Sequence, residues 1–228
     1  MDNHPNNANP TRLPSAEEAA VLRERFREFL TVQQQYRAAI REVTTKLEIL
    51  NDEFQVLHNH NPIHHIESRL KSVESMIAKL RAKELPINFD TARKHVMDIA
   101  GVRVVCRYIE DIYHVASLLL AQNDVELLLK KDYIQSPKPN GYRSLHLIIR
   151  IPVFLSTQTV HIPVEVQLRT VAMDFWASLE HPLRYKLHDE IPAGVNEELQ
   201  DCSEAIAALD RQMQDLFHRI QNRDNPSA

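Results

Sequence analysis

Residues 145–170 read LHLIIRIPVFLSTQTVHIPVEVQLRT, and two runs within this stretch alternate between apolar and polar side chains. Because successive side chains of a β-strand point to opposite faces of the sheet, this alternation predicts strands at 145–151 and 160–170. The connection between them is short enough for a hairpin. A third run, GVRVVCRY at 101–108, is rich in β-branched residues and predicts another strand.

Helical periodicity surrounds these strands on both sides. A capping box formed by Ser15 and Glu18 begins an apolar stripe that continues to Leu50, as one long helix or two shorter ones. Further helices are predicted at 72–84, 90–97, 111–122, 171–186 and 195–222. The fold class that follows is α+β, a mixed β-sheet core with flanking N- and C-terminal helices.

The chain divides into five parts by composition. We expect a disordered tail at 1–14, an N-terminal helical region at 15–60, a core at 61–190, a C-terminal helix at 191–222 and a tail at 223–228. The polar stretches HNHNPIHH (58–65) and Lys130 to Ser144 are expected to be loops. The four histidines of the first stretch are expected to be solvated, because no cysteine accompanies them as a metal ligand.

Composition limits the class of function. The 228 residues carry 27 Lys and Arg against 31 Asp and Glu, a net charge of −4, which disfavours a protein that coats nucleic acid. Only 3 glycines are present, with no Walker A sequence and no GxGxxG motif, so side-chain cations must bind any phosphate. Cys106 and Cys202 are too few for a disulfide scaffold. No apolar run approaches the roughly 20 residues that span a bilayer, and no secretory signal is visible. We therefore expect a cytoplasmic protein with no membrane partner.

The polar faces of the predicted strands carry the chemistry. They present Arg103, His146, Glu165, Gln167 and Arg169, and Asp98 lies directly before the first strand. The carboxylates of Asp98 and Glu165 are available to bind a divalent cation or to remove a proton. The pattern indicates either an anion-binding or catalytic surface or an ordinary sheet face in water.

The stretch before residue 145 adds cations and an aromatic ring. Lys131 and Lys138 supply charge for phosphates, and Tyr142 follows Gly141 in a turn where its ring can stack on a base. A generic hairpin turn would have a similar sequence. For Tyr142 we expect the face of the ring, and not the hydroxyl, to make the contact.

Five segments, taken in order, resemble one known family. They are ESRLKS (67–72), MDIAGVRVVC (97–106), DYIQSPKPNGYRSLH (132–146), IPVEVQLRT (162–170) and AMDFWASLEHPLRYK (172–186). They are similar to the RelA/SpoT-type (p)ppGpp synthetases, most closely to the small RelQ-like alarmone synthetases, over about residues 20–222. The resemblance implies a nucleotidyltransferase-like core. It also implies transfer of the pyrophosphate of ATP to the 3′-OH of GTP or GDP, with Mg²⁺ as cofactor and AMP as the second product.

The resemblance also implies roles for individual residues. Arg69 and Arg103 would sandwich the adenine of ATP, and its phosphates would be held by Lys71, Ser75, Lys79 and Arg81. Tyr142 would stack on guanine, and the rest of the GTP pocket would comprise Lys131, Lys138, Asn140, His146 and Gln167. Asp98 would be the magnesium ligand. Glu165 would be a second metal contact or the base for the 3′-OH.

The last predicted helix has an apolar residue every three or four positions, among them Leu209, Met213, Leu216 and Ile220. This stripe predicts packing on the helix's own domain or a contact between copies of the chain. The resemblance implies a homo-oligomer, a tetramer, with a possible allosteric alarmone site between subunits. Two other functions stay open, a relative that pyrophosphorylates the 3′ end of tRNA and a non-catalytic nucleotide sensor. RNA binding is likewise open.

Overall fold

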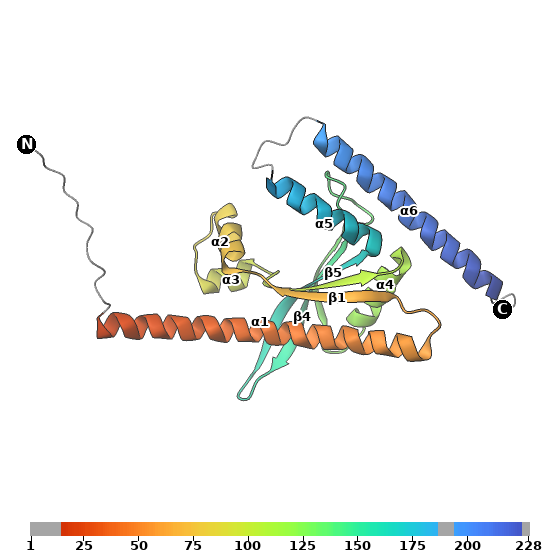
Figure 1. The fold of residues 1–228 in the computed structure, drawn as a ribbon. Coiled ribbons are helices and arrows are strands. Elements are labelled where there is room, and N and C mark those ends of the chain that lie inside the picture. The colour runs from red at the N-terminus through yellow and green to blue at the C-terminus, as the bar shows by residue number, and fades with distance from the viewer. Residues whose placement is uncertain (1–14, 187–193, 225–228) are drawn as a thin grey trace, which may run out of the picture. The chain divides into compact units, whose positions relative to one another are not determined.

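The computed structural model describes residues 15–186 and 194–224, which form six helices and five strands (Figure 1). The elements are α1 (Ala16–Leu57), β1 (Ile63–Leu70), α2 (Val73–Ala82), α3 (Phe89–His95), β2 (Ala100–Cys106), α4 (Ile109–Leu120), β3 (Glu126–Asp132), β4 (Leu145–Phe154), β5 (Thr159–Thr170), α5 (Val171–Lys186) and α6 (Val195–Asp224). The tail expected at 1–14 lies outside the described residues, as does the end of the tail expected at 223–228. No helix in the described ranges is both long enough and apolar enough to cross a membrane.

Helix α1 is continuous over 42 residues, yet the chain divides into two compact units between Gln34 and Gln35. The first unit contains the N-terminal part of α1. It begins with the predicted capping box, in which the Glu18 amide donates to Ser15 Oγ and the Ser15 amide to Glu18 Oε2. The second unit holds the remainder of α1 and every strand. In this part of α1 an apolar stripe that includes Tyr36, Val43 and Leu47 is buried.

The five strands form one mixed sheet in the order β1-β2-β5-β4-β3. Strand β5 is parallel to β2 and antiparallel to β4, and both edge strands are antiparallel to their neighbours. The predicted α+β class and the predicted hairpin between the last two strands are therefore confirmed.

The two edge strands, β1 and β3, correct the sequence analysis. Residues 63–65 were expected in a solvated linker and residues 130–132 in a loop, but they belong to β1 and β3. Neither strand alternates between buried and exposed positions, and nearly all of β3 is exposed. A strand hydrogen-bonded on one side only can carry polar residues on both faces, so it lacks the period-2 pattern that identifies a half-buried strand.

The core lies on the apolar face of the three central strands, as the alternation predicts. Val104, Leu147, Val164, Val166 and Leu168 are all fully buried there. Helix α4 packs on β2 and β5 with a strongly apolar face. The expected core positions of Cys106 and Trp176 are confirmed, since both are buried.

Helix α6 lies beside α5 and α4 (Figure 1). It packs on its own domain, which is one of the two alternatives given above. The residues that it buries there are not those of the apolar stripe. Its buried residues include Ser203, Ala207 and Asp210, and the Asp210 carboxylate accepts a hydrogen bond of 2.5 Å from Thr170 at the end of β5. Leu209, at the centre of the predicted stripe, is 54% exposed.

The same buried face of α6 holds the turn that carries Tyr142. Ser203 Oγ donates a hydrogen bond to the Gly141 carbonyl oxygen, and Arg143 Nη1 donates to Ser203 Oγ over 2.6 Å. Gly141 has a φ of +86°, and a Cβ atom there would lie 2.6 Å from Ser203 Cβ. A side chain at this position would therefore meet both backbone strain and a steric clash.

Gly141→Ala should lower the free energy of unfolding by more than the roughly 1–2 kcal/mol that a left-handed backbone costs a non-glycine residue. Gly194→Ala is the matched control, because Gly194 has a φ of +92° but a Cβ there would meet its nearest atom only at 3.8 Å. Urea denaturation of both variants measures the difference. Equal losses would show that Ser203 does not restrict the turn.

Candidate active site

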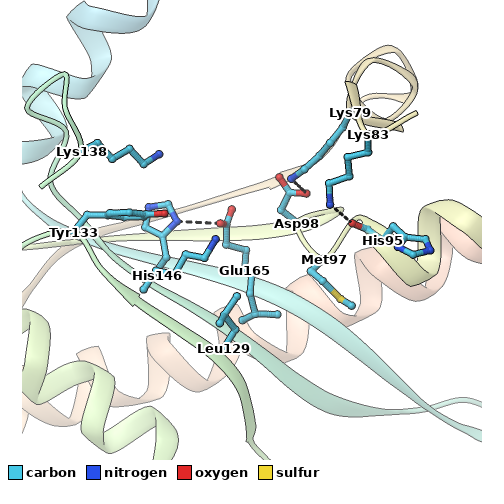
Figure 2. A pocket seen from close by; sticks show the side chains of 12 residues that line it. Lys79, Lys83, His95, Met97, Asp98, Leu129, Tyr133, Lys138, His146 and Glu165 are labelled. Atoms are coloured by element: carbon cyan, nitrogen blue, oxygen red, sulfur yellow. Dashed lines mark hydrogen bonds and ion pairs between the residues drawn. The ribbon is translucent and has the colours of Figure 1, made fainter. Parts of the chain in front are cut away.

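One pocket over the polar face of the sheet brings together six of the predicted site residues (Figure 2). Its volume is about 320 Å³. The six residues are Lys79, Asp98, Lys131, Lys138, His146 and Glu165. The remaining lining comes from Lys83, His95, Met97, Leu129, Tyr133 and Ile148.

Strand register explains why residues far apart in the sequence meet at this pocket. One row across the sheet contains Lys131 of β3, His146 of β4, Gln167 of β5 and Arg103 of β2. The next row places Glu165 between Ile148 of β4 and Gly101 of β2. Because paired residues point their side chains to the same face, every polar group in these rows faces the same side of the sheet.

Asp98 lies in the short connection between α3 and β2, beneath two lysines. Lys71 Nζ donates to Asp98 Oδ2 over 2.9 Å, and Lys79 Nζ forms an ion pair of 2.8 Å with Oδ1. Burial is the largest single influence on this carboxyl group and opposes its ionisation. The two lysines together outweigh burial and hold the pKa of Asp98 below its ordinary value. Asp98 is therefore a carboxylate at neutral pH.

Glu165, in the middle of β5, is the second carboxylate of the pocket. His146 Nδ1 lies 3.1 Å from its Oε1, and Gln167 Nε2 donates to its Oε2 over 2.8 Å. Burial would raise the pKa of Glu165, but His146 and Gln167 hold it below its ordinary value, against a smaller opposing effect from the charge of Asp98. That effect requires the two carboxylates to be close. Figure 2 shows both facing one space, with Lys138 on one side and Lys79 on the other.

Tyr142 lies at the edge of this site, and its hydroxyl is hydrogen-bonded within the protein. Tyr142 Oη is 2.8 Å from His146 Nε2 and accepts a hydrogen bond of 2.7 Å from Arg169 Nη2. The Lys138 ammonium lies 4.7 Å from the centre of the Tyr142 ring. The expectation that the face of the ring contacts a base stays a prediction, and these hydrogen bonds show that the hydroxyl is held within the protein.

A second, smaller pocket of about 50 Å³ adjoins the first on the polar face. Arg69 and Arg103, the predicted adenine pair, both line it, together with Gln167. Arg103 is oriented by ion pairs to Glu67 at 3.2 Å and to Asp174 at 3.4 Å. The two arginines therefore lie together on β1 and β2, and β2 is the direct neighbour of β5, which carries Glu165.

Five predicted residues line neither pocket, among the residues that the structure describes: Lys71, Ser75, Arg81, Asn140 and Tyr142. Ser75 and Arg81 are exposed on α2. The Asn140 amide donates to Glu180 Oε1 of α5 over 2.9 Å, and its Oδ1 accepts from the Tyr142 amide over 3.3 Å. Lys71 reaches the site only through its ion pair with Asp98.

Sequence reasoning assigned no role to Arg169, Asp174 or Tyr133. Arg169 follows Glu165 and Gln167 at the same two-residue spacing along β5. This spacing places it on the polar face and was the sequence feature that could have identified it as part of the site. Asp174 bridges Arg103 and Arg169 from α5, a contact that no local pattern encodes. Tyr133 lines the pocket directly after the edge strand β3, which the sequence analysis did not recognise.

The donor set of the pocket fits a hard divalent cation. Asp98 and Glu165 supply carboxylate oxygens, the ligands that Mg²⁺ prefers. Asp98 Oδ1 is buried and, despite the nearby ammonium of Lys79, accepts no hydrogen bond of good geometry. Among the described residues, no cluster of three or more His, Cys, Asp or Glu side chains is placed to hold a metal ion. A cation here would need further oxygen ligands from water or substrate.

The polar face of the sheet thus combines two ionised carboxylates with lysines in one pocket, beside a pair of arginines in a second. The pattern described as "Region found in RelA / SpoT proteins" matches residues 68–190, and the chain belongs to this family.

Similar proteins support the same assignment. The chain is 46% identical to the GTP pyrophosphokinase YwaC of Bacillus subtilis over 178 residues, 78% of this chain and 85% of YwaC. It is 37% identical to GTP pyrophosphokinase YjbM of the same organism over 186 residues, 82% of this chain and 87% of YjbM.

Solved structures of two B. subtilis proteins share the fold. The small alarmone synthetase 1, bound to its product pppGpp, matches with a TM-score of 0.79 and 35% identity over 85% of this chain and 98% of that one. The small alarmone synthetase 2 matches with a TM-score of 0.77 and 42% identity over 84% of this chain and 99% of that one.

The electrostatics of Asp98 can be tested directly. Lys79→Met and Lys71→Met each remove one cation while burial remains, so the pKa of Asp98 should rise. A carboxyl group whose pKa is lowered by folding stabilises the fold above its unfolded pKa, about 3.9 for Asp, and loses this contribution as the pH falls. Both variants should therefore lose unfolding free energy at neutral pH, and the loss should shrink in acid.

Carboxyl-carbon NMR titration, assigned with Asp98→Asn, and urea denaturation at several pH values make these measurements. Lys130→Met is the control, because Lys130 is an exposed lysine of β3 that does not line the pocket. An unchanged Asp98 titration in both lysine variants would contradict the electrostatic account.

Proposed function

We propose that this protein is a GTP pyrophosphokinase, which transfers the pyrophosphate of ATP to the 3′-OH of GTP or GDP and releases (p)ppGpp and AMP. The observation that carries the proposal is the pair of ionised carboxylates, Asp98 and Glu165, in one pocket lined by Lys79, Lys131 and Lys138. The two GTP pyrophosphokinases that align over more than three quarters of this chain support it.

In the proposed reaction the 3′-oxygen of the acceptor attacks the β-phosphorus of ATP. The bond between that phosphorus and the oxygen of the α-phosphate breaks, AMP leaves, and the 3′-OH proton passes to a base. Glu165 suits this role because its hydrogen bonds from His146 and Gln167 keep it ionised. Such a transfer also needs positioning and neutralisation of phosphate charge, which the lysines supply.

The two nucleotides would occupy different parts of the polar face. The adenine of ATP would lie between Arg69 and Arg103, whose guanidinium groups can stack on an aromatic base. Lys71 and Lys79 would hold its phosphates, with Ser75 and Arg81 approaching from α2. Guanine would stack on Tyr142, near Asn140 and Gln167, and Lys131, Lys138 and His146 would contact the phosphates of GTP.

We propose Mg²⁺ as the cofactor, held by Asp98 and Glu165. When bound, the ion neutralises charge on the transferring pyrophosphoryl group. The side chain of Lys79 is 37% exposed, so its ammonium group can leave the ion pair with Asp98 and pair with a substrate phosphate instead. A cytoplasmic location, where ATP and GTP are available, fits this chemistry.

The proposal is tested by incubating the protein with Mg²⁺, ATP labelled at the β-phosphate, and GTP, GDP or deacylated tRNA. Label should pass to the guanine nucleotide with one AMP released per transfer. Asp98→Asn and Glu165→Gln should each lower the rate at least about 100-fold, the range for loss of an acid-base or charge-stabilising group. Circular dichroism should show both variants folded.

Three results would contradict the proposal in different ways. Labelling of tRNA alone would favour the RNA-modifying alternative, whereas nucleotide binding without transfer would favour a sensor. Near-wild-type turnover of either carboxylate variant would remove that residue from the reaction.

We further propose that the protein is a homo-oligomer, a tetramer by its resemblance to the family, with a possible alarmone site between subunits. The apolar stripe of α6 supports an interface, because Leu209, Met213 and Ile220 are 54%, 46% and 60% exposed. On α5, Phe175 and Leu179 are also exposed, by 60% and 52%. Large apolar side chains gathered at the surface are typical of protein contacts.

Leu209→Asp combined with Leu216→Asp should reduce the particle mass in light scattering while circular dichroism stays unchanged, since charges at a buried interface are strongly unfavourable. Ala208→Asp is the control for each single substitution, because it adds one such charge at an exposed position beside the stripe. An oligomer that survives the double substitution would exclude this helix from the interface.

A further inference from the structure

Arg169, at the end of β5, is a buried cation directly behind the pocket. It is only 5% exposed, and its guanidinium group is held at several points. Nη1 donates to Asp174 Oδ1 over 3.1 Å, and Nη2 donates to Tyr142 Oη over 2.7 Å and to Gln167 Oε1 over 3.1 Å. A buried charge with this many partners has little freedom to move.

The direction of the hydrogen bonds follows from the chemistry of arginine, which donates and never accepts. Tyr142 Oη accepts from Arg169, and the ionised Glu165 can only accept from His146 Nδ1, so in the neutral ring the phenolic hydrogen is donated to His146 Nε2, 2.8 Å away. Nε2 is then an acceptor, and the ring carries its hydrogen on Nδ1. That Nδ1–H group lies 3.1 Å from Glu165 Oε1 and donates to it.

A second path leads from Arg169 to the other oxygen of the same carboxylate. Gln167 Oε1 accepts from Arg169, which fixes the orientation of the amide and turns its Nε2 toward Glu165. This nitrogen donates to Glu165 Oε2 over 2.8 Å. Each oxygen of Glu165 therefore receives one hydrogen bond, and the orientation of both donors is set by one guanidinium group.

We propose that Arg169 is a positioning residue that orients Glu165 through two hydrogen-bonded paths, one by way of Tyr142 and His146 and the other by way of Gln167. Asp174 anchors the guanidinium from α5. Asp174 also pairs with Arg103, which lines the second pocket, so the same anchor orients a residue on each side of the site. The catalytic consequence rests on the proposed function, in which Glu165 accepts a proton from the 3′-OH.

The proposal gives the two parts of the Tyr142 side chain separate roles. The ring, which lies 4.7 Å from the Lys138 ammonium and 5.1 Å from the Arg169 guanidinium, would take a base by stacking, which contributes about 1–3 kcal/mol, or roughly 10- to 100-fold in affinity. The hydroxyl, together with the carboxylate of Glu165, favours the Nδ1–H tautomer of His146. Tyr142→Phe removes the hydroxyl alone, whereas Tyr142→Ala removes both.

The first measurement is spectroscopic and needs no activity. In protein labelled with ¹⁵N-histidine, long-range ¹H–¹⁵N correlation spectra at mildly basic pH distinguish Nδ1–H from Nε2–H rings, and His146→Gln identifies the signal. Wild type should show His146 as the Nδ1–H tautomer. Tyr142→Phe should shift it toward the Nε2–H form, because Nε2 has then lost its donor.

The second measurement is the steady-state rate of (p)ppGpp synthesis. Tyr142→Phe should lower kcat by about 10- to 100-fold, the range for loss of a group that orients a catalytic residue, with little change in the KM for GTP. Tyr142→Ala should lower kcat similarly and also raise the KM for GTP. Arg169→Lys retains the charge but loses the planar fork, so its kcat should fall as in Tyr142→Phe.

Tyr113→Phe is the matched control. Tyr113 also lies between a donor and an acceptor, since Gln135 Nε2 donates to its hydroxyl over 3.3 Å and the hydroxyl donates to Asp132 Oδ2 over 3.2 Å. It does not line either pocket and should leave the His146 signal and kcat unchanged.

The possible failures are distinguishable. A His146 tautomer that is the same in wild type and Tyr142→Phe overturns the positioning role, as does a wild-type kcat in Tyr142→Phe. A wild-type protein that makes no (p)ppGpp overturns the proposed function instead, and the tautomer measurement still decides whether Arg169 sets the hydrogen bonds.

Discussion

Strand β5 is hydrogen-bonded to β2 in parallel register and to β4 in antiparallel register, and this double pairing positions the polar groups that the central strands contribute to the site. It sets Glu165 opposite Gly101 and Ile148, and Gln167 opposite Arg103 and His146. A shift of one residue would turn Glu165 and Gln167 into the apolar core and Val166 into the pocket. Val164, Val166 and Leu168 of β5, all fully buried, prevent that shift, so the energy that packs the core also positions the polar groups of the pocket.

The polar face would be unstable if its charges were unpaired. Burial disfavours both carboxylates, and each is compensated locally, Asp98 by lysines and Glu165 by His146 and Gln167. Because each carboxylate has its own hydrogen-bond partners, both can stay ionised although they lie close together. A single cation shared between them would stabilise the two negative charges less. The result is a surface with negative charge at its floor and lysines at its rim, suited to a metal ion below and phosphates above.

Much of this arrangement could be predicted from the alternation of side chains, and the failures have a common cause. The three central strands, their apolar faces and the placement of Glu165 on the polar side follow from period-2 patterns, because one face of each is buried. Strands β1 and β3 lack the pattern because they lie at the edges. The contacts of Asp174 with Arg103 and Arg169 join α5 to two strands, and no local sequence signal specifies such a pairing. Likewise, the stripe on α6 identified a helix but not the face that packs, because the domain contacts use the small and polar residues Ser203, Ala207 and Asp210.

The lysines and the arginines of the site differ in how firmly they are held, and this difference follows from the chemistry of their side chains. With 3 glycines in the chain, a backbone loop cannot surround the phosphates, so side chains must do so. The pocket cations Lys79, Lys131 and Lys138 carry compact charges on flexible chains, which can follow phosphates as bonds change. Arg103 and Arg169 are instead held in place by Asp174, and a planar fork suits groups that must stay fixed. Exchanging the two residue types would preserve net charge and still impair the site, because a lysine at position 169 cannot serve Asp174, Tyr142 and Gln167 in one geometry. We therefore expect the proposed activity to depend on the separation of exposed lysines from arginines that are held in place, and not only on the total positive charge around the pocket.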